Sequence, residues 1–152
     1  MNSIADIQYN TCFWAAFFSW CLAQFIKLVI NFVKTRDIDF RYFASTGGMP
    51  SAHSATVCGL ATSIGITEGF ISPVFALSTV FAVITMFDAS TVRRAAGQQA
   101  TVLNSIVREL FHDHKLNNER LKELLGHTRF EVSMGMITGV IFSTLYCFYV
   151  EK

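Results

Sequence analysis

Long stretches without charge constrain this chain more than any other feature. Residues 11–33 hold one charged side chain, Lys27, and residues 69–87 and 132–150 hold none. Residues 42–67 are also uncharged, although glycines and a proline near the start of that run interrupt a helix. A helix needs about 20 apolar residues to cross the hydrocarbon core of a bilayer. The sequence therefore predicts that the solvent of this chain is a membrane.

These stretches predict an all-α fold, a polytopic membrane helix bundle of about four transmembrane helices. Residues 1–152 are expected to form a single membrane domain, with spans at about 11–34, 52–68, 72–88 and 131–150. The polar loop 89–130 separates the third and fourth spans. It is expected to hold an amphipathic helical segment at the membrane interface, with the clearest helical pattern around HDHKLNNERLKELL.

The composition excludes several other classes of protein. Hydrophobic residues make up 52% of the chain and charged residues 15%, against about 25% charged in soluble domains. This excludes a disordered chain, and a net charge of +1 provides no basic field for nucleic acid. The four cysteines form no C-x-x-C pair, so we expect reduced, buried thiols and neither a metal site nor a disulfide framework. The chain has no nucleotide-binding loop, and no cofactor is expected.

Charge asymmetry predicts the orientation in the membrane. Lys34, Arg36 and Arg41 follow the first span, and seven Lys or Arg residues follow the third, whereas the N-terminus has none. The positive-inside rule then places the first and third loops in the cytoplasm and both termini outside. We expect an integral membrane protein of a bacterial cytoplasmic membrane or an organelle membrane, with its functional site on the cytoplasmic side.

The string GGMPSAHSA, residues 47–55, is suited to bind an anion. Gly48 lets the backbone approach a ligand closely, and Pro50 fits the first turn of a helix. Ser51 and His53 then lie at a helix N-terminus, where free backbone N–H groups favour negative charge. A histidine at such a place is often a capping or packing residue. Beside a cationic loop, His53 is also a candidate acid or base.

Cations gather at the same predicted membrane edge. Lys27 lies near the end of the first span, where it either snorkels to the interface or joins Lys34 and Arg36 in an anion clamp. In the string DASTVRRAAGQQA, Arg93 and Arg94 follow the third span. An arginine there either anchors a helix end through an ion pair or holds two phosphate oxygens at once.

The string LKELLGHTRFEV, residues 121–132, places His127 and Glu131 four residues apart, on one helical face. A carboxylate bonded to one imidazole nitrogen fixes the tautomer and raises the basicity of the other nitrogen, as a nucleophilic histidine requires. Ordinary pairing on a helix surface produces the same spacing, so both interpretations stand at this point.

Together, the three strings resemble the divergent branch of the type-2 phosphatidic acid phosphatase family. These are small integral membrane proteins related to acid phosphatases and vanadium haloperoxidases. The resemblance covers roughly residues 20–140. The wider superfamily commonly has six membrane helices, so about four here imply a reduced bundle or assembly between chains as a homo-oligomer.

The superfamily carries the signatures K-x6-R-P, P-S-G-H and S-R-x5-H-x3-D, in that order. Lys27 resembles the lysine of the first, and Lys34 stands at its arginine position. Ser51 and His53 match the second, with Ala52 in place of its glycine.

The third signature is matched at its histidine and its acid. His127 and Glu131 resemble these two residues, and Leu121 stands at the arginine position. The positive charge at that position must then come from elsewhere, for which Arg93, Arg94, Arg120 and Lys122 are candidates.

The resemblance implies a metal-independent membrane phosphatase that hydrolyses a lipid phosphate or diphosphate through a phosphohistidine. In this scheme His127 is the nucleophile, Glu131 supports its ring and His53 protonates the leaving oxygen. The remaining site residues would bind the phosphate oxygens: Lys27, Lys34, Arg36, Gly48, Ser51, Arg93 and Arg94. The expected partner is a membrane lipid of the phosphatidylglycerol phosphate, phosphatidate or prenyl diphosphate class.

Two other functions remain open from the sequence. One is a non-catalytic membrane protein that binds phospholipid or phosphate and keeps only the anion pocket. The other is a small transporter or channel subunit that uses the intramembrane Lys27.

Overall fold

The computed structural model describes residues 4–36, 48–110 and 126–150. The described residues form helices and no strand, which confirms the all-α class. The helices are η1 (Ile4–Tyr9), a 3-10 turn, and α1 (Thr11–Thr35), α2 (Ala52–Thr67), α3 (Pro73–Ser90), α4 (Val92–Leu110) and α5 (Arg129–Val150).

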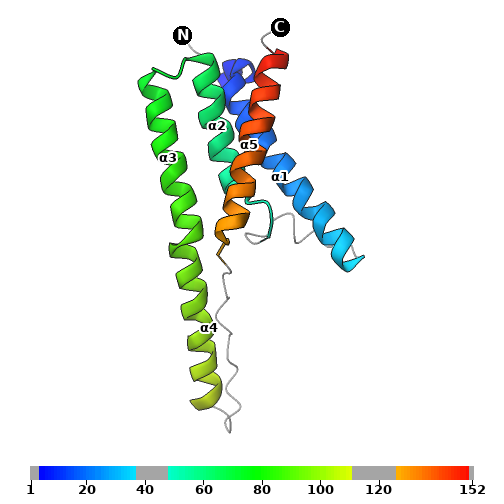
Figure 1. Ribbon diagram of the computed structural model, residues 1–152, viewed down its shortest axis with the longest axis vertical. Helices are drawn as coiled ribbons and strands as arrows, with labels where there is room; N and C mark the ends of the chain where they lie inside the picture. The colour runs from blue at the N-terminus through cyan, green and yellow to red at the C-terminus, as the bar shows by residue number, and fades with distance from the viewer. Residues whose placement is uncertain (1–3, 37–47, 111–125, 151–152) are drawn as a thin grey trace.

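Helix α2 forms the centre of the bundle and packs against α1, α3 and α5 (Figure 1). Its residues are mostly small, which lets three neighbours approach it from different sides. The buried positions on α2 are Ala52, Ser54, Ala55, Val57, Cys58, Gly59, Ala61, Ser63, Ile64 and Gly65. A helix that is apolar on most of its faces is buried on most of its faces.

Two glycines of α5 set its closest approach to α2. A Cβ atom on Gly135 would collide with the backbone carbonyl of Ser51, and one on Gly139 would collide with that of Ala55. This is the close packing that a G-x-x-x-G spacing permits in lipid. The other pair with this spacing does not act in the same way. Gly69 lies in the turn after α2 with φ +90°, and an added Cβ there would meet no atom within 4 Å.

Three helices of the described chain are long and apolar enough to cross a membrane. These are α1, α3 with its continuation as far as Val107, and α5. Helix α2 forms where the second span is predicted, but its 16 residues rise only about 24 Å, against a hydrocarbon core of about 30 Å. The chain is thus an integral membrane helix bundle built around a short central helix.

The polar loop predicted at 89–130 is in part a regular helix. Helix α4 follows α3 after Thr91 and continues nearly in line with it beyond the bundle (Figure 1). It is amphipathic, and Val92, Leu103 and Ile106 are exposed. The segment around HDHKLNNERLKELL, for which the helical pattern was predicted, lies outside the described residues. Arg, Gln and Ala favour a helix, and one interior glycine is tolerated, so the polarity of this loop was no evidence against α4.

Both chain ends lie at one end of the bundle (Figure 1). The end of α1, the beginning of α2, the α3–α4 junction and the beginning of α5 therefore lie at the other end. Lys34, Arg94 and Arg129 belong to these segments. The cationic positions of three separate stretches are thus gathered on one side of the bundle, whereas the cytoplasmic assignment of that side stays a prediction.

Candidate functional site

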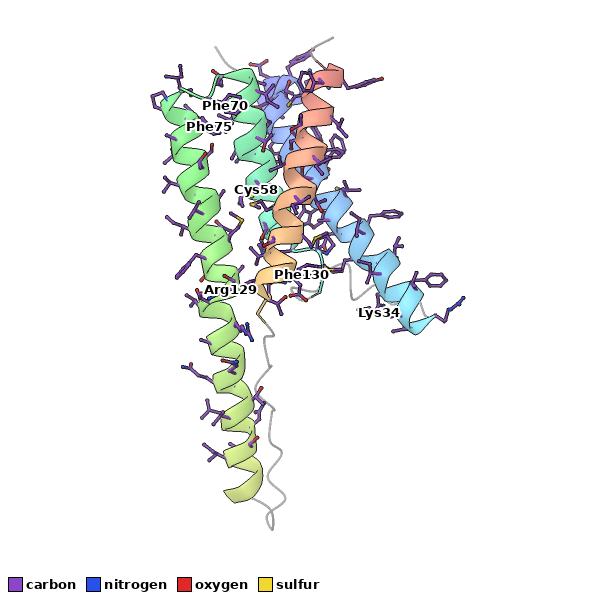
Figure 2. The ribbon with its side chains drawn as sticks, viewed as in Figure 1. Lys34, Cys58, Phe70, Phe75, Arg129 and Phe130 are labelled. Atoms are coloured by element: carbon purple, nitrogen blue, oxygen red, sulfur yellow. The ribbon has the colours of Figure 1, made fainter. Side chains whose placement is uncertain are left out.

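A cavity of about 500 Å3 lies at this cationic end, between α1, the segment before α2 and the beginning of α5. Figure 2 shows Phe130 at the beginning of α5 and Lys34 near the end of α1, where the two helices diverge. The described lining residues are Lys27, Ile30, Asn31, Lys34, Thr35, Gly48, Met49, Thr128, Phe130 and Glu131. The wall therefore carries two lysines and one carboxylate next to apolar side chains.

Lys27 is the most deeply placed cation of this wall. Its side chain is only 4% exposed, although it lies within a helix that is long and apolar enough to cross the membrane. Gly48 has φ +87°, and a Cβ there would lie 3.5 Å from Cγ of Lys27, so the backbone turn packs along the lysine stem. Glu131 shares the cavity and attracts the Lys27 ammonium. A buried cation in a membrane helix is costly, and this makes Lys27 a functional candidate.

His127 and Glu131 form the predicted pair, but not on one helical face, because His127 lies before the beginning of α5 at Arg129. Nδ1 of His127 lies 3.3 Å from Oε2 of Glu131. The backbone N–H of His127 donates to the carbonyl of Ala89, at 3.1 Å, and this bond ties the segment before α5 to the end of α3. The residue is only 3% exposed, and Glu131 and Thr128 form the neighbouring part of the cavity wall.

Glu131 has a second task that the sequence analysis missed. The N–H of Thr128 donates to Oε2 of Glu131 at 2.9 Å, and the N–H of Glu131 donates to Oγ1 of Thr128 at 3.2 Å. This reciprocal pair is a capping box at the beginning of α5. The signal was present as T-x-x-E directly before an apolar run. The same carboxylate oxygen therefore caps a helix and holds the imidazole.

Ser51 joins α2 to this region through its backbone. Its N–H donates to the carbonyl oxygen of Glu131, at 3.0 Å. Its hydroxyl is the N-cap of α2 and accepts from the N–H of Ser54 at 3.4 Å and from the Ser54 hydroxyl at 3.0 Å. Ser51 is fully buried, and the described cavity wall does not include it.

The remaining predicted site residues lie outside the described cavity wall. His53 is exposed in the first turn of α2, and Arg36 is an exposed C-cap residue of α1 with φ 58°. Arg93 and Arg94 lie in the first turn of α4, where Arg94 is exposed. Leu121, at the arginine position of the third signature, lies outside the described residues. The fold thus gathers Lys27, Lys34, Gly48, His127 and Glu131, whereas His53, Arg36 and Arg94 do not line the described cavity.

The donor set of this region suits an anion better than a metal ion. Within the residues that the structure describes, no three His, Cys, Asp or Glu side chains gather closely enough to hold a metal. Two ammonium groups and the N-terminal ends of α2 and α5 instead provide positive charge and dipoles at one end of the bundle.

Comparison with known proteins agrees with this geometry. The family model described as the divergent PAP2 family matches residues 8–142. The chain belongs to the divergent PAP2 family. It is also 43% identical, over 138 residues, to the uncharacterized membrane protein YuiD of Bacillus subtilis (strain 168), a match that covers 84% of this chain and 87% of that protein. No solved structure matches the divergent PAP2 chain.

The range matched by the family model includes every residue of the described cavity wall, since these residues lie between Lys27 and Glu131 in the sequence. The resemblance noted from three short strings is therefore confirmed at the level of the family.

Proposed function

We propose that this divergent PAP2 chain is a metal-independent membrane phosphatase that hydrolyses a lipid phosphate or diphosphate through a phosphohistidine. One observation carries the proposal: a carboxylate-bound histidine lies against the wall of a cavity that also holds two lysines. A carboxylate at Nδ1 favours the tautomer with its proton on that nitrogen, so Nε2 is the atom that attacks phosphorus.

The proposed reaction has two displacements. In the first, Nε2 of His127 forms a bond to phosphorus while the P–O bond to the lipid alcohol breaks, and His53 protonates the departing oxygen. In the second, water attacks the phosphohistidine and the histidine leaves as phosphate is released. The position of His53 supports its role only through the backbone: Ser51, two residues earlier, is bonded to the carbonyl of Glu131.

The lysines supply the electrostatic part of the reaction. Phosphoryl transfer spreads negative charge over the three equatorial oxygens of phosphorus, and catalysis consists mainly of positioning and stabilising that charge. The presence of Lys27 and Lys34 in one wall of the cavity supports this role. Removing one such donor typically costs about 100- to 1000-fold in rate.

The apolar part of the wall supports a lipid as the substrate. Ile30, Met49 and Phe130 line the cavity beside the lysines, and Phe130 is largely exposed. A phosphate with a hydrocarbon tail matches such a mixed wall, because the headgroup meets the cations and the tail meets the apolar side chains. Phosphatidylglycerol phosphate, phosphatidate and prenyl diphosphates all have this form.

The decisive experiment measures phosphate release from lipid phosphates by the purified full-length protein in detergent with EDTA. His127→Ala should abolish release at unchanged yield of folded protein, and His112→Ala, outside the three strings, serves as the matched control. Unimpaired turnover by His127→Ala would refute the nucleophile.

A second candidate function is non-catalytic binding of phospholipid or phosphate. Two observations favour it: His127 is only 3% exposed, and the Glu131 carboxylate is already engaged as a helix cap. A binder would retain a lipid phosphate with an affinity that depends on Lys27, release no phosphate, and be insensitive to His127→Ala.

A further inference from the structure

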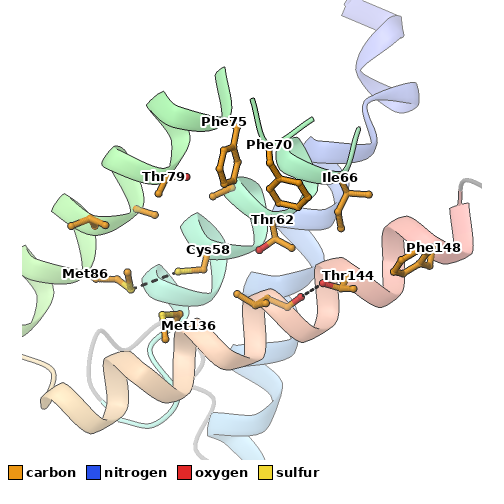
Figure 3. A pocket seen from close by; sticks show the side chains of 14 residues that line it. Cys58, Thr62, Ile66, Phe70, Phe75, Thr79, Met86, Met136, Thr144 and Phe148 are labelled. Atoms are coloured by element: carbon orange, nitrogen blue, oxygen red, sulfur yellow. Dashed lines mark hydrogen bonds between the residues drawn. The ribbon is translucent and has the colours of Figure 1, made fainter. Parts of the chain in front are cut away.

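A second concave surface lies between α2, α3 and α5, and it differs in character from the cationic cavity. It is a groove of about 620 Å3, with its floor on α2 and its walls on α3 and α5 (Figure 3). Phe70 and Phe75 stand at one end, with ring centroids 5.2 Å apart. Cys58 and Met86 stand toward the other end, with their sulfur atoms 3.6 Å apart.

Small side chains create this groove. The floor is formed in part by Cys58, Ala61 and Thr62, and Ala82 lies on the α3 wall. The described lining has no Asp, Glu, Lys, Arg or His. Of the hydroxyls, that of Thr144 donates to the carbonyl of Val140 at 2.8 Å, whereas Oγ1 of Thr79 is buried and has no hydrogen-bond partner among the described residues. The wall is therefore complementary to an uncharged, apolar occupant.

The length and volume of the groove favour a lipid chain over a transmembrane helix or water. Along α5 the lining extends from Met136 to Phe148, a rise of about 18 Å. One leaflet of the hydrocarbon core is about 15 Å thick, so a single lipid chain has the matching length. A transmembrane helix is about 10 Å wide and occupies about 1400 Å3 over the same rise, so the groove could enclose only one side of it. Ordered water needs two to four polar partners, and the described wall offers it little beyond threonine hydroxyls.

We propose that this groove binds one hydrocarbon chain of a membrane lipid. Exposed lining residues such as Val83 and Phe148 connect the groove to the lipid phase. Hydrophobic transfer does not drive binding, because the bilayer is as apolar as the groove. The driving force is dispersion: a chain of the right width contacts all three helices, whereas lipid that bridges over the groove would lose contacts on its inner side.

The bound hydrocarbon chain would also limit the movement of the two helices next to the candidate site. Met86 lies three residues before Ala89, whose carbonyl accepts from the N–H of His127. Met136 lies five residues after Glu131 on α5. A hydrocarbon chain packed between Met86 and Met136 therefore fixes the distance between α3 and α5, the two helices that position His127. Binding in the groove itself does not depend on any catalytic activity of the protein.

The test uses a phosphatidylglycerol that carries a photoreactive diazirine along one acyl chain. The full-length protein is reconstituted in phosphatidylglycerol vesicles with a trace of this probe, irradiated, digested and mapped by mass spectrometry. Adducts should concentrate on groove residues, Met86 and Met136 above all, relative to lipid-facing residues of α3 outside the groove such as Leu77 and Ile84.

A matched pair of variants provides the control. Val140→Trp fills the groove, whereas Ile141→Trp adds the same side chain at a neighbouring exposed position outside the lining. Groove adducts should fall roughly 10-fold in the first variant, equivalent to about 1.4 kcal/mol of lost binding, and stay unchanged in the second.

Three results would overturn the proposal. Adducts spread evenly over all lipid-facing residues of the wild-type protein would mean annular lipid only, and this readout needs no variant. Equal adduct yields in the two Trp variants would show that the groove is not where the chain binds. Absence of adducts on groove residues, while the other lipid-facing residues are labelled, would show that something other than lipid fills the groove.

Discussion

Replacing Glu131 by Gln separates the two tasks of one carboxylate. Its Oε2 accepts from the Thr128 N–H at 2.9 Å and lies 3.3 Å from Nδ1 of His127. Glutamine also completes a capping box, so the beginning of α5 should remain intact. The negative charge beside the His127 ring is lost, so a charged hydrogen bond worth about 1.5–3 kcal/mol becomes a neutral one worth about 0.5–1.5 kcal/mol. The difference of about 1–1.5 kcal/mol corresponds to a loss of roughly 10-fold in rate.

The companion variant Thr128→Ala weakens the capping box and leaves the carboxylate beside His127 unchanged. It removes the hydroxyl that accepts from the Glu131 N–H at 3.2 Å and leaves the carboxylate in place. Loss of a cap of this kind costs about 0.5–2 kcal/mol of stability, with activity largely retained.

Phosphate release and thermal unfolding in detergent, measured on both variants and the wild-type protein, give the comparison. We expect Glu131→Gln to lose activity without losing stability, and Thr128→Ala to lose stability first. If Glu131→Gln keeps full turnover, the carboxylate is only a helix cap and the argument for an activated His127 is refuted.

Three further predictions follow from the packing and charge of the described residues. Gly139→Ala should lower the unfolding free energy by about 1–3 kcal/mol, because its Cβ meets a backbone carbonyl of α2, whereas the lipid-facing Ile137→Ala should change the melting temperature little. Lys27→Met keeps the packed stem but removes the ammonium, and should cut kcat/KM for a lipid phosphate about 100- to 1000-fold; equal rates in variant and wild type would exclude Lys27 from charge stabilisation. Lys34→Met, at an exposed position of the same wall, should cost less than Lys27→Met and should depend more on salt, as titration of the rate with NaCl would show.

Much of the fold could be predicted from local sequence patterns. The uncharged runs predicted where α1, α2, α3 and α5 begin and end to within a few residues, because the absence of charge over a membrane-length stretch leaves few alternatives to a helix. The sequence analysis predicted a polar loop where α4 forms, because the residues of α4 are mostly polar. The central position of α2 could not be predicted from the sequence either. The length of this segment predicts only a short helix, and its position depends on which three helices surround it.

Part of the candidate site could also be predicted from the sequence, and part of it could not. Sequence spacing predicted the contact between His127 and Glu131, but the expected reason was wrong. His127 lies before the capping residue Thr128 and outside α5, and the contact forms because the Glu131 carboxylate turns back toward the beginning of the helix. The sequence analysis did not predict that Glu131 also caps α5, although the T-x-x-E pattern was present. It placed His53, Arg36 and Ser51 with the lysines, whereas the described cavity wall holds none of these three.

By itself, the sequence determined the membrane environment, the apolar helices and the family, since these depend on runs of side chains and on short motifs. Only the tertiary structure decided that Lys27 and Glu131, which are far apart in the chain, line one cavity. It also decided that α5 approaches α2 closely enough for two glycines to touch backbone carbonyls. The physical reason is that local periodicity fixes which face of a helix is apolar, whereas the partner of that face is selected by packing among all the helices at once.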